Sequence, residues 1–541
     1  MRELNQAKCL VRSRELSPAD QPETDRTNSD ALPAVRFARR IRLFAAAFEV
    51  KDEIWIETDI ALWHRDSYCW EGMSTILVLG GGVIGLSMAM MLARQGHSVT
   101  VLEQDSEPLP GSPEEAWRAW ERQGVTQFRL PHYLHPPVRQ LLDSNLPDVK
   151  EALLRADCLT FDVLTTMPPS ITDRTAREGD ERFITITGRR SAIEYAFASV
   201  AEGLIPIRRG FTVGGLLAGP SVVKGIPHVT GVRTVDGEEF SADLVVDATG
   251  RGSKLPSWLE ALGARRPIEE AETSGFIYYT QYFRCKTGAL PLCRAALMTY
   301  FHSFSLLTLP GDAGTWSVTV VITSRDQALK KLRDPKHWRA LVAACPLHAH
   351  WLDGEPITDV LLMGGILDRY RRFVVDGAPV ATGVLGVGDS WACTNPSLGR
   401  GIAMGLMQAL GTSEAVRQHP DNPLALALAQ DTMTETRVTP WYRNTIEIDR
   451  AWIARFDALI EGGPEPQPTD PRARVAKALS VAMMYDPDLF RAANEMRSLL
   501  ALPKEVMARP GLVDRILEVA DTHEAVITPG PSRRELLDML T

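Results

Sequence analysis

A glycine-rich turn between a strand and a helix constrains this chain more than any other feature. Residues 75–79 (TILVL) have the composition of a buried strand, residues 80–82 are three glycines, and residues 83–96 have the apolar period of a helix. A second strand, residues 98–103 (SVTVLE), follows at once. Two strands joined through a helix in this way pair in parallel. The sequence therefore predicts a doubly wound α/β fold that begins near Met73.

The spacing Gly80-x-Gly82-x-x-Gly85 adds a binding function to this turn. Gly80 allows the tight turn, Gly82 lets the backbone approach a pyrophosphate, and Gly85 lets helix and strand pack closely. The N-terminus of the helix stabilises phosphate charge. Glu103 ends the next strand, where its carboxylate can bind a ribose diol and repel a 2′-phosphate. We predict a dinucleotide site; the motif does not separate FAD from NAD, and its structural alternative is a tight turn alone.

Length and composition exclude several classes. The chain has 541 residues, 45% of them hydrophobic, so it can bury the cores of two or three domains. Its net charge of −9 gives little attraction to nucleic acid. The seven cysteines are scattered and lack metal-ligand spacing, which favours a reducing, cytoplasmic compartment and no metal site. The apolar run at residues 75–92 contains four glycines, so we expect no transmembrane segment.

Composition and pattern predict four segments. Residues 1–72 are polar and then basic-apolar, and we interpret them as a poorly ordered extension. The predicted dinucleotide domain comprises 73–275 and 376–412, with a helix at 190–202 and a meander at about 211–246 that turns at Asp236-Gly237. Residues 276–375 are rich in Tyr, Phe, Trp, Val and Thr, which favours an inserted, mixed β-sheet substrate domain. Residues 413–541 are predicted to be helical, interrupted by GGPEPQPTDP.

Two later segments distinguish the cofactors. Residues 243–253 (DLVVDATGRGS) form a strand and turn, and residues 386–405 (GVGDSWACTNPSLGRGIAMG) place Asp389 after a strand and before a glycine-rich loop that opens a helix. In this order, and with the glycine turn, they resemble the flavoprotein monooxygenase superfamily, which includes aromatic hydroxylases, squalene- and polyether-type epoxidases, flavin halogenases and geranylgeranyl reductases. The resemblance spans about residues 75–410. It implies a Rossmann-type FAD-binding domain.

The resemblance also implies individual FAD contacts. Asp389 matches an aspartate that hydrogen-bonds the ribityl chain, and Arg190 matches an arginine that reaches the phosphates. Val213 matches a strand position near the adenine, and Arg129, close to His132, matches a further flavin contact. The loop formed by Pro396, Gly399 and Gly401 matches backbone at the pyrimidine edge of the isoalloxazine. Asp389 has a structural alternative as a turn residue. In the segment 243–253, Asp243 and Asp247 also suit strand caps and Ser253 suits a helix cap.

The implied activity is that of an FAD-dependent oxidoreductase. The leading prediction is a monooxygenase that hydroxylates or epoxidises a small apolar substrate through a flavin C4a-hydroperoxide, with electrons from NADH, NADPH or a separate flavin reductase. No catalytic side chain is assigned, because this chemistry needs no protein nucleophile. The alternatives are a flavin dehydrogenase or reductase of a lipid-like or polyketide substrate, and a non-catalytic flavin-binding scaffold or sensor. The W-x-W-x-I-P element expected of a halogenase is missing.

Arg400 and a group of aromatic residues each allow more than one interpretation. Arg400 puts a long cation in the SLGRG loop, where it could tune the flavin, bind substrate or obstruct the ring. The aromatic residues of the inserted segment could line a substrate pocket, although aromatic residues in strands more often belong to a core. These residues are Tyr278, Tyr279, Tyr282, Phe283 and Trp316.

Overall fold

The strand, turn and helix predicted near Met73 open the fold. The computed structural model describes residues 73–286 and 289–541, all within one compact unit. Strand β1 (Thr75–Leu79) leads into helix α1 (Val83–Arg94) and strand β2 (Ser98–Glu103). The predicted extension, residues 1–72, lies outside the described residues.

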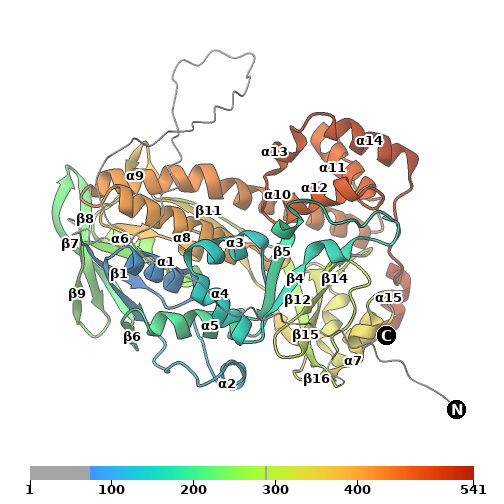
Figure 1. The fold of residues 1–541 in the computed structure, drawn as a ribbon, viewed down its shortest axis with the longest axis horizontal. Coiled ribbons are helices and arrows are strands. Elements are labelled where there is room, and N and C mark those ends of the chain that lie inside the picture. Colours follow the sequence, from blue (N-terminus) through green and yellow to red (C-terminus); the bar gives the residue numbers. More distant parts are fainter. Residues whose placement is uncertain (1–72, 287–288) are drawn as a thin grey trace, which may run out of the picture. The chain divides into compact units, whose positions relative to one another are not determined.

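A five-stranded parallel sheet forms the centre of the first region, in the order β21-β10-β1-β2-β6. Strands β1 and β6 of this sheet are labelled in Figure 1. Helix α1 packs against α5 and α8, and its apolar face is buried with strands β1 and β2 in the largest core cluster. The predicted α/β class is therefore confirmed. The further members of this layer are β6 (Ile207–Arg209), β10 (Leu244–Asp247), β21 (Val384–Gly386), α5 (Arg190–Glu202) and α8 (Gly401–Gln418).

The inserted segment folds into a second, antiparallel sheet ordered β13-β14-β15-β12-β16. Its five singled-out aromatic residues are at most 5% exposed; Tyr279, Phe283 and Trp316 pack in one core cluster and Tyr278 in another, while a pocket role stays a prediction. A smaller sheet, β11-β18-β22, crosses the predicted domain boundaries, which stay a prediction. The strands are β11 (Ile268–Thr273), β12 (Phe276–Arg284), β13 (Met298–Tyr300), β14 (Ser305–Pro310), β15 (Thr315–Thr323), β16 (Glu355–Pro356), β17 (Leu361–Met363), β18 (Leu367–Arg372) and β22 (Ala392–Cys393).

The predicted meander is present as β7 (Val213–Val223), β8 (Ile226–Thr234) and β9 (Glu239–Ser241), paired antiparallel. Gly237 has φ +90° in the turn between β8 and β9, a conformation that glycine adopts without strain. The other elements are α2 (Pro113–Arg118), β3 (Pro131–Leu134), α3 (Pro136–Asn145), α4 (Pro147–Arg155), β4 (Leu159–Asp162), β5 (Ile184–Arg189), α6 (Leu255–Ala261), α7 (Pro335–Ala343), β19 (Val374–Val375) and β20 (Ala378–Pro379).

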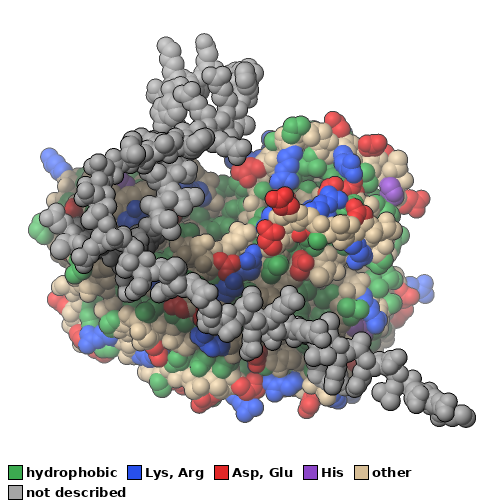
Figure 2. All heavy atoms as spheres, viewed as in Figure 1, with side chains coloured by type: hydrophobic (Ala, Val, Ile, Leu, Met, Phe, Trp, Pro, Cys, Tyr) green, Lys and Arg blue, Asp and Glu red, His purple; other side chains and the backbone are tan. Residues whose placement is uncertain are grey.

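The chain after α8 is helical, as predicted, and residues 461–470 form the expected break. A π-helical turn, Thr434–Val438, joins the first two helices of this region. On the face shown in Figure 2, acidic and basic side chains are interspersed over the C-terminal helices. The helices are α9 (Pro423–Met433), α10 (Thr439–Ile460), α11 (Pro471–Ala482), α12 (Pro487–Arg497), α13 (Pro503–Met507), α14 (Leu512–Thr522) and α15 (Arg533–Met539).

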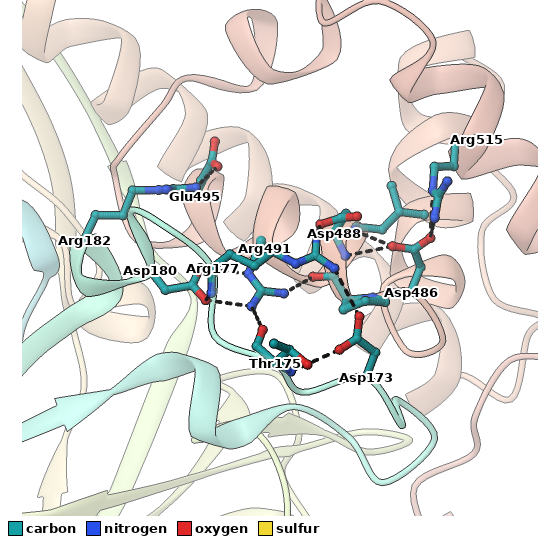
Figure 3. A network of polar contacts seen from close by, with 12 residues as sticks. Asp173, Thr175, Arg177, Asp180, Arg182, Asp486, Asp488, Arg491, Glu495 and Arg515 are labelled. Atoms are coloured by element: carbon teal, nitrogen blue, oxygen red, sulfur yellow. Dashed lines mark hydrogen bonds and ion pairs between the residues drawn. The ribbon is translucent and has the colours of Figure 1, made fainter.

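Ion pairs fix these last helices to a loop far earlier in the chain (Figure 3). Arg491 of α12 binds Asp180 with N–O distances of 2.8 and 2.7 Å. Arg182 binds Glu495 at 2.8 Å. Beneath them, Met167 and Ile171 share an apolar cluster with α11, α12 and α14. Among the described residues, no helix is both long and apolar enough to cross a bilayer.

Substituting Gly85 tests the tight packing of the first turn. A Cβ at this position would stand 2.0 Å from the Gly80 carbonyl oxygen and 3.2 Å from Cβ of Ala248. Gly80 and Ala248 directly follow β1 and β10, so neither can move away easily and α1 must shift instead. We therefore expect Gly85→Ala to lower the free energy of unfolding by about 1–3 kcal/mol. Urea titration measures this. Gly215→Ala is the control, since its Cβ would meet nothing within 4 Å; equal unfolding midpoints for the two variants would contradict the packing argument.

Candidate functional site

The glycine turn has the geometry of a phosphate-binding loop. Gly80 has φ +100°, and a Cβ there would come within 2.6 Å of the Ala248 carbonyl oxygen. A Cβ on Gly82, in contrast, would meet nothing within 4 Å, so the backbone at the start of α1 is open to approach. The α1 N-terminus therefore offers free N–H groups on an accessible side.

A buried arginine that the sequence analysis missed holds this turn in place. Arg122 donates to Glu103 (3.0 Å), Asp105 (3.0 Å) and Glu194 (3.4 Å), and its Nη2 also donates to the Gly81 carbonyl oxygen. Its side chain is 3% exposed. Burial alone would lower the pKa of Arg122, but the three carboxylates outweigh that effect and raise it. Arg122 is therefore charged, and it joins the ends of β1, β2 and α5.

Glu103 is engaged within the protein at the position where a ribose contact is predicted. Its Oε2 accepts the Gly81 N–H (2.7 Å) as well as Arg122, and its Oε1 accepts the Asp105 N–H (3.0 Å). A carboxylate has about four acceptor positions, so one remains for a diol. The ribose contact stays a prediction.

Arg190, a predicted phosphate contact, is the first residue of α5. Its guanidinium pairs with Glu194 (Nε to Oε1, 2.8 Å), the same buried carboxylate that binds Arg122. His132, on β3, is close enough for Arg190 to affect its titration. Burial first and then the Arg190 charge lower the pKa of His132 to about 3, so the imidazole is neutral at physiological pH.

Asp389 follows β21 at the carboxyl end of the parallel sheet, as predicted. Burial raises the pKa of its carboxyl, while the charges of Arg251, Arg190 and Arg369 act in the opposite direction. Within the described residues no hydrogen bond reaches its side chain, which is partly exposed. Arg251 and Arg369 are further residues that the sequence analysis did not assign; Arg369 donates to the Arg251 carbonyl oxygen at 2.6 Å. The structure thus gathers one carboxylate and three cations beside the glycine turn.

The segment at residues 243–253 is held by its own acidic residues. Asp247 accepts hydrogen bonds from the Thr249 N–H (2.9 Å) and from the Ser253 hydroxyl (2.5 Å). Asp243 accepts the first N–H of β1, on Thr75, at 2.7 Å. Asp243, Asp247 and Ser253 therefore have the structural role given above as the alternative, since their side chains bind within the protein.

The loop Pro396–Gly401 follows β22 and ends at the first residue of α8. Gly399 has φ +66°, and His135 contacts the loop through the Leu398 carbonyl oxygen (2.8 Å). A Cβ on Gly401, the first residue of α8, would meet nothing within 4 Å. The N–H groups at the start of α8 are consequently accessible, which fits a site that stabilises negative charge on a reduced ring.

The side chain of Arg400 anchors this loop to the C-terminal helices. It donates to Asn444 (2.9 Å), Thr445 (3.1 Å) and the Met496 carbonyl oxygen (3.1 Å). It also stacks over Trp441. Burial lowers its pKa to about 10, and it remains charged. Its three hydrogen bonds go to α10 and α12, so its role in this structure is to position the loop.

Two buried carboxylates accept hydrogen bonds from the start of the same loop and from the residue before it. Asp368 of β18 accepts the Asn395 N–H, and Asp449 of α10 accepts the Ser397 hydroxyl at 2.8 Å. Burial raises the pKa of Asp368 to about 7 and that of Asp449 to about 6. These residues are 2% and 4% exposed, and both went unrecognised in the sequence because nothing local marks them.

The two remaining predicted contacts lie nearby. Arg129 donates to the carbonyl oxygens of Ala116 and Trp120, both at 3.0 Å, at the end of α2. Val213 opens β7, two residues after Phe211, whose N–H donates to the Glu103 carbonyl oxygen at 2.9 Å. Their FAD contacts stay predictions. In the part of the chain that the structure describes, no group of three His, Cys, Asp or Glu side chains could hold a metal ion.

These residues fit FAD. The open backbone at Gly82 and the guanidinium of Arg190 suit a pyrophosphate, and the partly exposed Asp389 carboxylate suits a ribityl hydroxyl. The accessible start of α8 suits the ring.

Comparison with known proteins points to the same cofactor. The model of the family described as FAD dependent oxidoreductase matches residues 75–143. Protein Rv3254 of Mycobacterium tuberculosis is 26% identical over 353 residues, which cover 62% of this chain and 71% of that protein. The resemblance to flavoprotein oxidoreductases is therefore confirmed.

Solved structures share the fold at low identity. The flavin-dependent brominase Bmp2 has a TM-score of 0.54 with 16% identity, covering 83% of this chain and 99% of its own. PqsL, a probable FAD-dependent monooxygenase from Pseudomonas aeruginosa, has a TM-score of 0.52 with 16% identity, covering 72% of this chain and 97% of its own. These likenesses show the fold.

Removing the Arg122 guanidinium should weaken both the fold and FAD binding. In Arg122→Met the carboxylates of Glu103, Asp105 and Glu194 lose their common cation while buried, and we expect a loss of about 3–5 kcal/mol in the free energy of unfolding. Urea titration and quenching of FAD fluorescence are the measurements. Arg118→Met is the control, because that side chain is 70% exposed and its ion pair contributes little. Equal stability of both variants would show that Arg122 does not hold the turn.

Asp368 makes stability depend on pH. Its folded pKa of about 7 lies above the ordinary value of 3.8, so the folded state holds the proton more tightly. Its contribution is complete below about pH 4 and is lost as the pH rises to 7. Between pH 5 and pH 8 the wild type should lose about 2–3 kcal/mol more than Asp368→Asn, measured by urea unfolding. Parallel pH profiles of the two proteins would refute this assignment.

Proposed function

Because the chain has the fold and the glycine-turn segment of FAD-dependent oxidoreductases, we propose that it is an FAD-dependent monooxygenase acting on a small, largely apolar molecule. The open backbone at Gly82, with Arg190 at the start of α5 and Asp389 directly after β21, is the observation that carries the FAD assignment. The likeness to PqsL, itself described as a probable FAD-dependent monooxygenase, supports the reaction class.

Bound FAD would supply hydride acceptance and oxygen activation, and the chain's own residues would bind and orient it. Asp389 would accept a ribityl hydroxyl, and Arg190 with the α1 N-terminus would bind the phosphates. N–H groups at the start of α8 would stabilise negative charge at the pyrimidine edge. His132, which is neutral, would donate or accept one hydrogen bond beside Arg190 without adding charge.

The structural likeness to the brominase Bmp2 makes a flavin-dependent halogenase the second candidate function. A monooxygenase is favoured because the chain lacks the W-x-W-x-I-P element that we expect of halogenases. The proposed electron donor is NADH or NADPH, used directly or through a separate flavin reductase. The proposed compartment is the cytoplasm, consistent with the scattered cysteines.

A redox cycle tests the proposed activity. The FAD-loaded protein is mixed anaerobically with NADH or NADPH and then with oxygen while the flavin absorption is followed. We expect nicotinamide to bleach the flavin and oxygen to restore it, with transfer of an ¹⁸O atom from labelled O₂ to a converted substrate. If only a flavin reductase bleaches the flavin, the donor is a partner protein. Oxidation of substrate with no ¹⁸O incorporation would replace monooxygenase by dehydrogenase.

Substituting Asp389 tests the cofactor site separately. Asp389→Ala removes the proposed acceptor for a ribityl hydroxyl, so we expect the Kd for FAD to rise at least about tenfold, or about 1.4 kcal/mol. Quenching of flavin fluorescence measures it. Asp421→Ala is the matched control, because Asp421 is an exposed acid outside the site. An unchanged Kd in Asp389→Ala would place the ribityl chain elsewhere.

A further inference from the structure

A cavity of about 460 Å³ lies between the β11-β18 strands and helix α10. Its size falls within the range of about 300–1,000 Å³ that is typical of small-molecule sites. Gly275, directly before β12, and Thr323, the last residue of β15, line the cavity, and α10 contributes Ile446, Ile453 and Ala454. The wall formed by α10 is therefore apolar only in part, because Asp449, Arg450 and Asp457 of the same helix also line the cavity.

Two ion pairs between the sheets and α10 account for the exposed charges of this cavity. Arg450 binds Glu272 at 2.9 Å, and Arg325 binds Asp457 at 2.7 Å. The two arginine side chains are 65% and 74% exposed. These four charges cancel in pairs at the solvent side.

The deeper lining contains two acids that form no ion pair within the described residues, although the charge of Arg400 lowers the pKa of Asp449. Asp368 and Asp449 both line the cavity, and no ion pair reaches either one in the described chain. Oδ2 of Asp449 has no hydrogen bond of ordinary geometry, although Asn395 lies close enough to lower the pKa of Asp449. The Ser274 hydroxyl also lines the cavity, is 2% exposed and has no hydrogen-bond partner within the described residues. Buried acids and hydroxyls are ordinarily paired, so these groups indicate a ligand.

We propose that this cavity binds the substrate by a basic nitrogen, with an ammonium group between Asp368 and Asp449, its third hydrogen bond to Ser274, and an apolar body against Ile446 and Ile453. This assignment deepens the proposed function, on which it rests, by naming the substrate class as a lipophilic amine. An ammonium group stabilises the ionised form of the two acids, and the same two acids repel a competing anion.

The cavity also adjoins the proposed flavin site. Asp368 and Asp449 hold Asn395 and Ser397, which begin the loop Pro396–Gly401 or precede it directly. A ligand that binds the two acids would therefore contact the side chains that hold the loop Pro396–Gly401 in place. This proximity is what a substrate requires and what a remote effector does not.

Three probes of nearly equal shape test the charge preference. Tryptamine is cationic, tryptophol is its neutral alcohol counterpart, and indole-3-propionate is anionic. Isothermal calorimetry with the FAD-loaded full chain should give a Kd for tryptamine at least about tenfold below that for tryptophol, with indole-3-propionate the weakest. Asp449→Asn and Asp368→Asn should each reduce this preference to about twofold or less. Asp376→Asn, which removes an equal charge from an exposed turn, should keep it.

The outcomes separate the two proposals. Equal affinity for tryptamine and tryptophol, no binding of either at about 1 mM, or an unchanged preference in both cavity variants would overturn the amine site. Thermal unfolding of each variant shows whether it is folded, and Ser274→Ala gives a second test that leaves the charges in place, with an expected threefold to tenfold weaker binding of tryptamine. Calorimetry needs no turnover, so a flavin that fails to cycle would refute the monooxygenase while the binding result stands.

Discussion

One buried guanidinium sets the geometry on which the nucleotide end of this fold depends. Arg122 binds acids from the end of β2 and from α5, and it also binds a carbonyl oxygen of the glycine turn. Three buried acids so close together would repel one another without it, and a buried charge is tolerated only when it is paired. The turn, the second strand and the fifth helix are therefore held as one rigid unit, and Glu194 extends that unit to Arg190.

Elements whose signals lie in consecutive residues could be predicted from the sequence. Strands β1 and β2 and helix α5 match their predicted ranges, and α1 ends two residues early, because strand composition, glycine spacing and helical period are local. Arg122 could not be found, since it lies in an irregular segment and its partners come from three elements. Arg251 and Arg369 are 118 residues apart, and only the folded chain brings them to Asp389.

The loop Pro396–Gly401 has a glycine pattern that the sequence shows and contacts to α10 that only the structure shows. Its glycine pattern was recognisable in the sequence, and the accessible start of α8 agrees with it. Its other side depends on α10, through Ser397, Arg400 and Asp449. The C-terminal helices therefore act on the proposed flavin site through one short loop, and the ion pairs around Arg491 secure those helices (Figure 3).

The strand order of the parallel sheet determines when the sheet can be completed during synthesis. Strand β21 pairs with β10 and closes the sheet edge next to Asp389, but it begins at Val384, about three hundred residues after β1. A ribosome adding about 5–20 residues per second needs about 15–60 s to synthesise that distance. Strand β10 ends at Asp247, so its edge is open, with unpaired backbone groups, while the residues between Asp247 and Val384 are made, which takes about 7–27 s. Nascent chains must therefore wait, shielded from aggregation, until the last parallel strand emerges and the cofactor can be acquired.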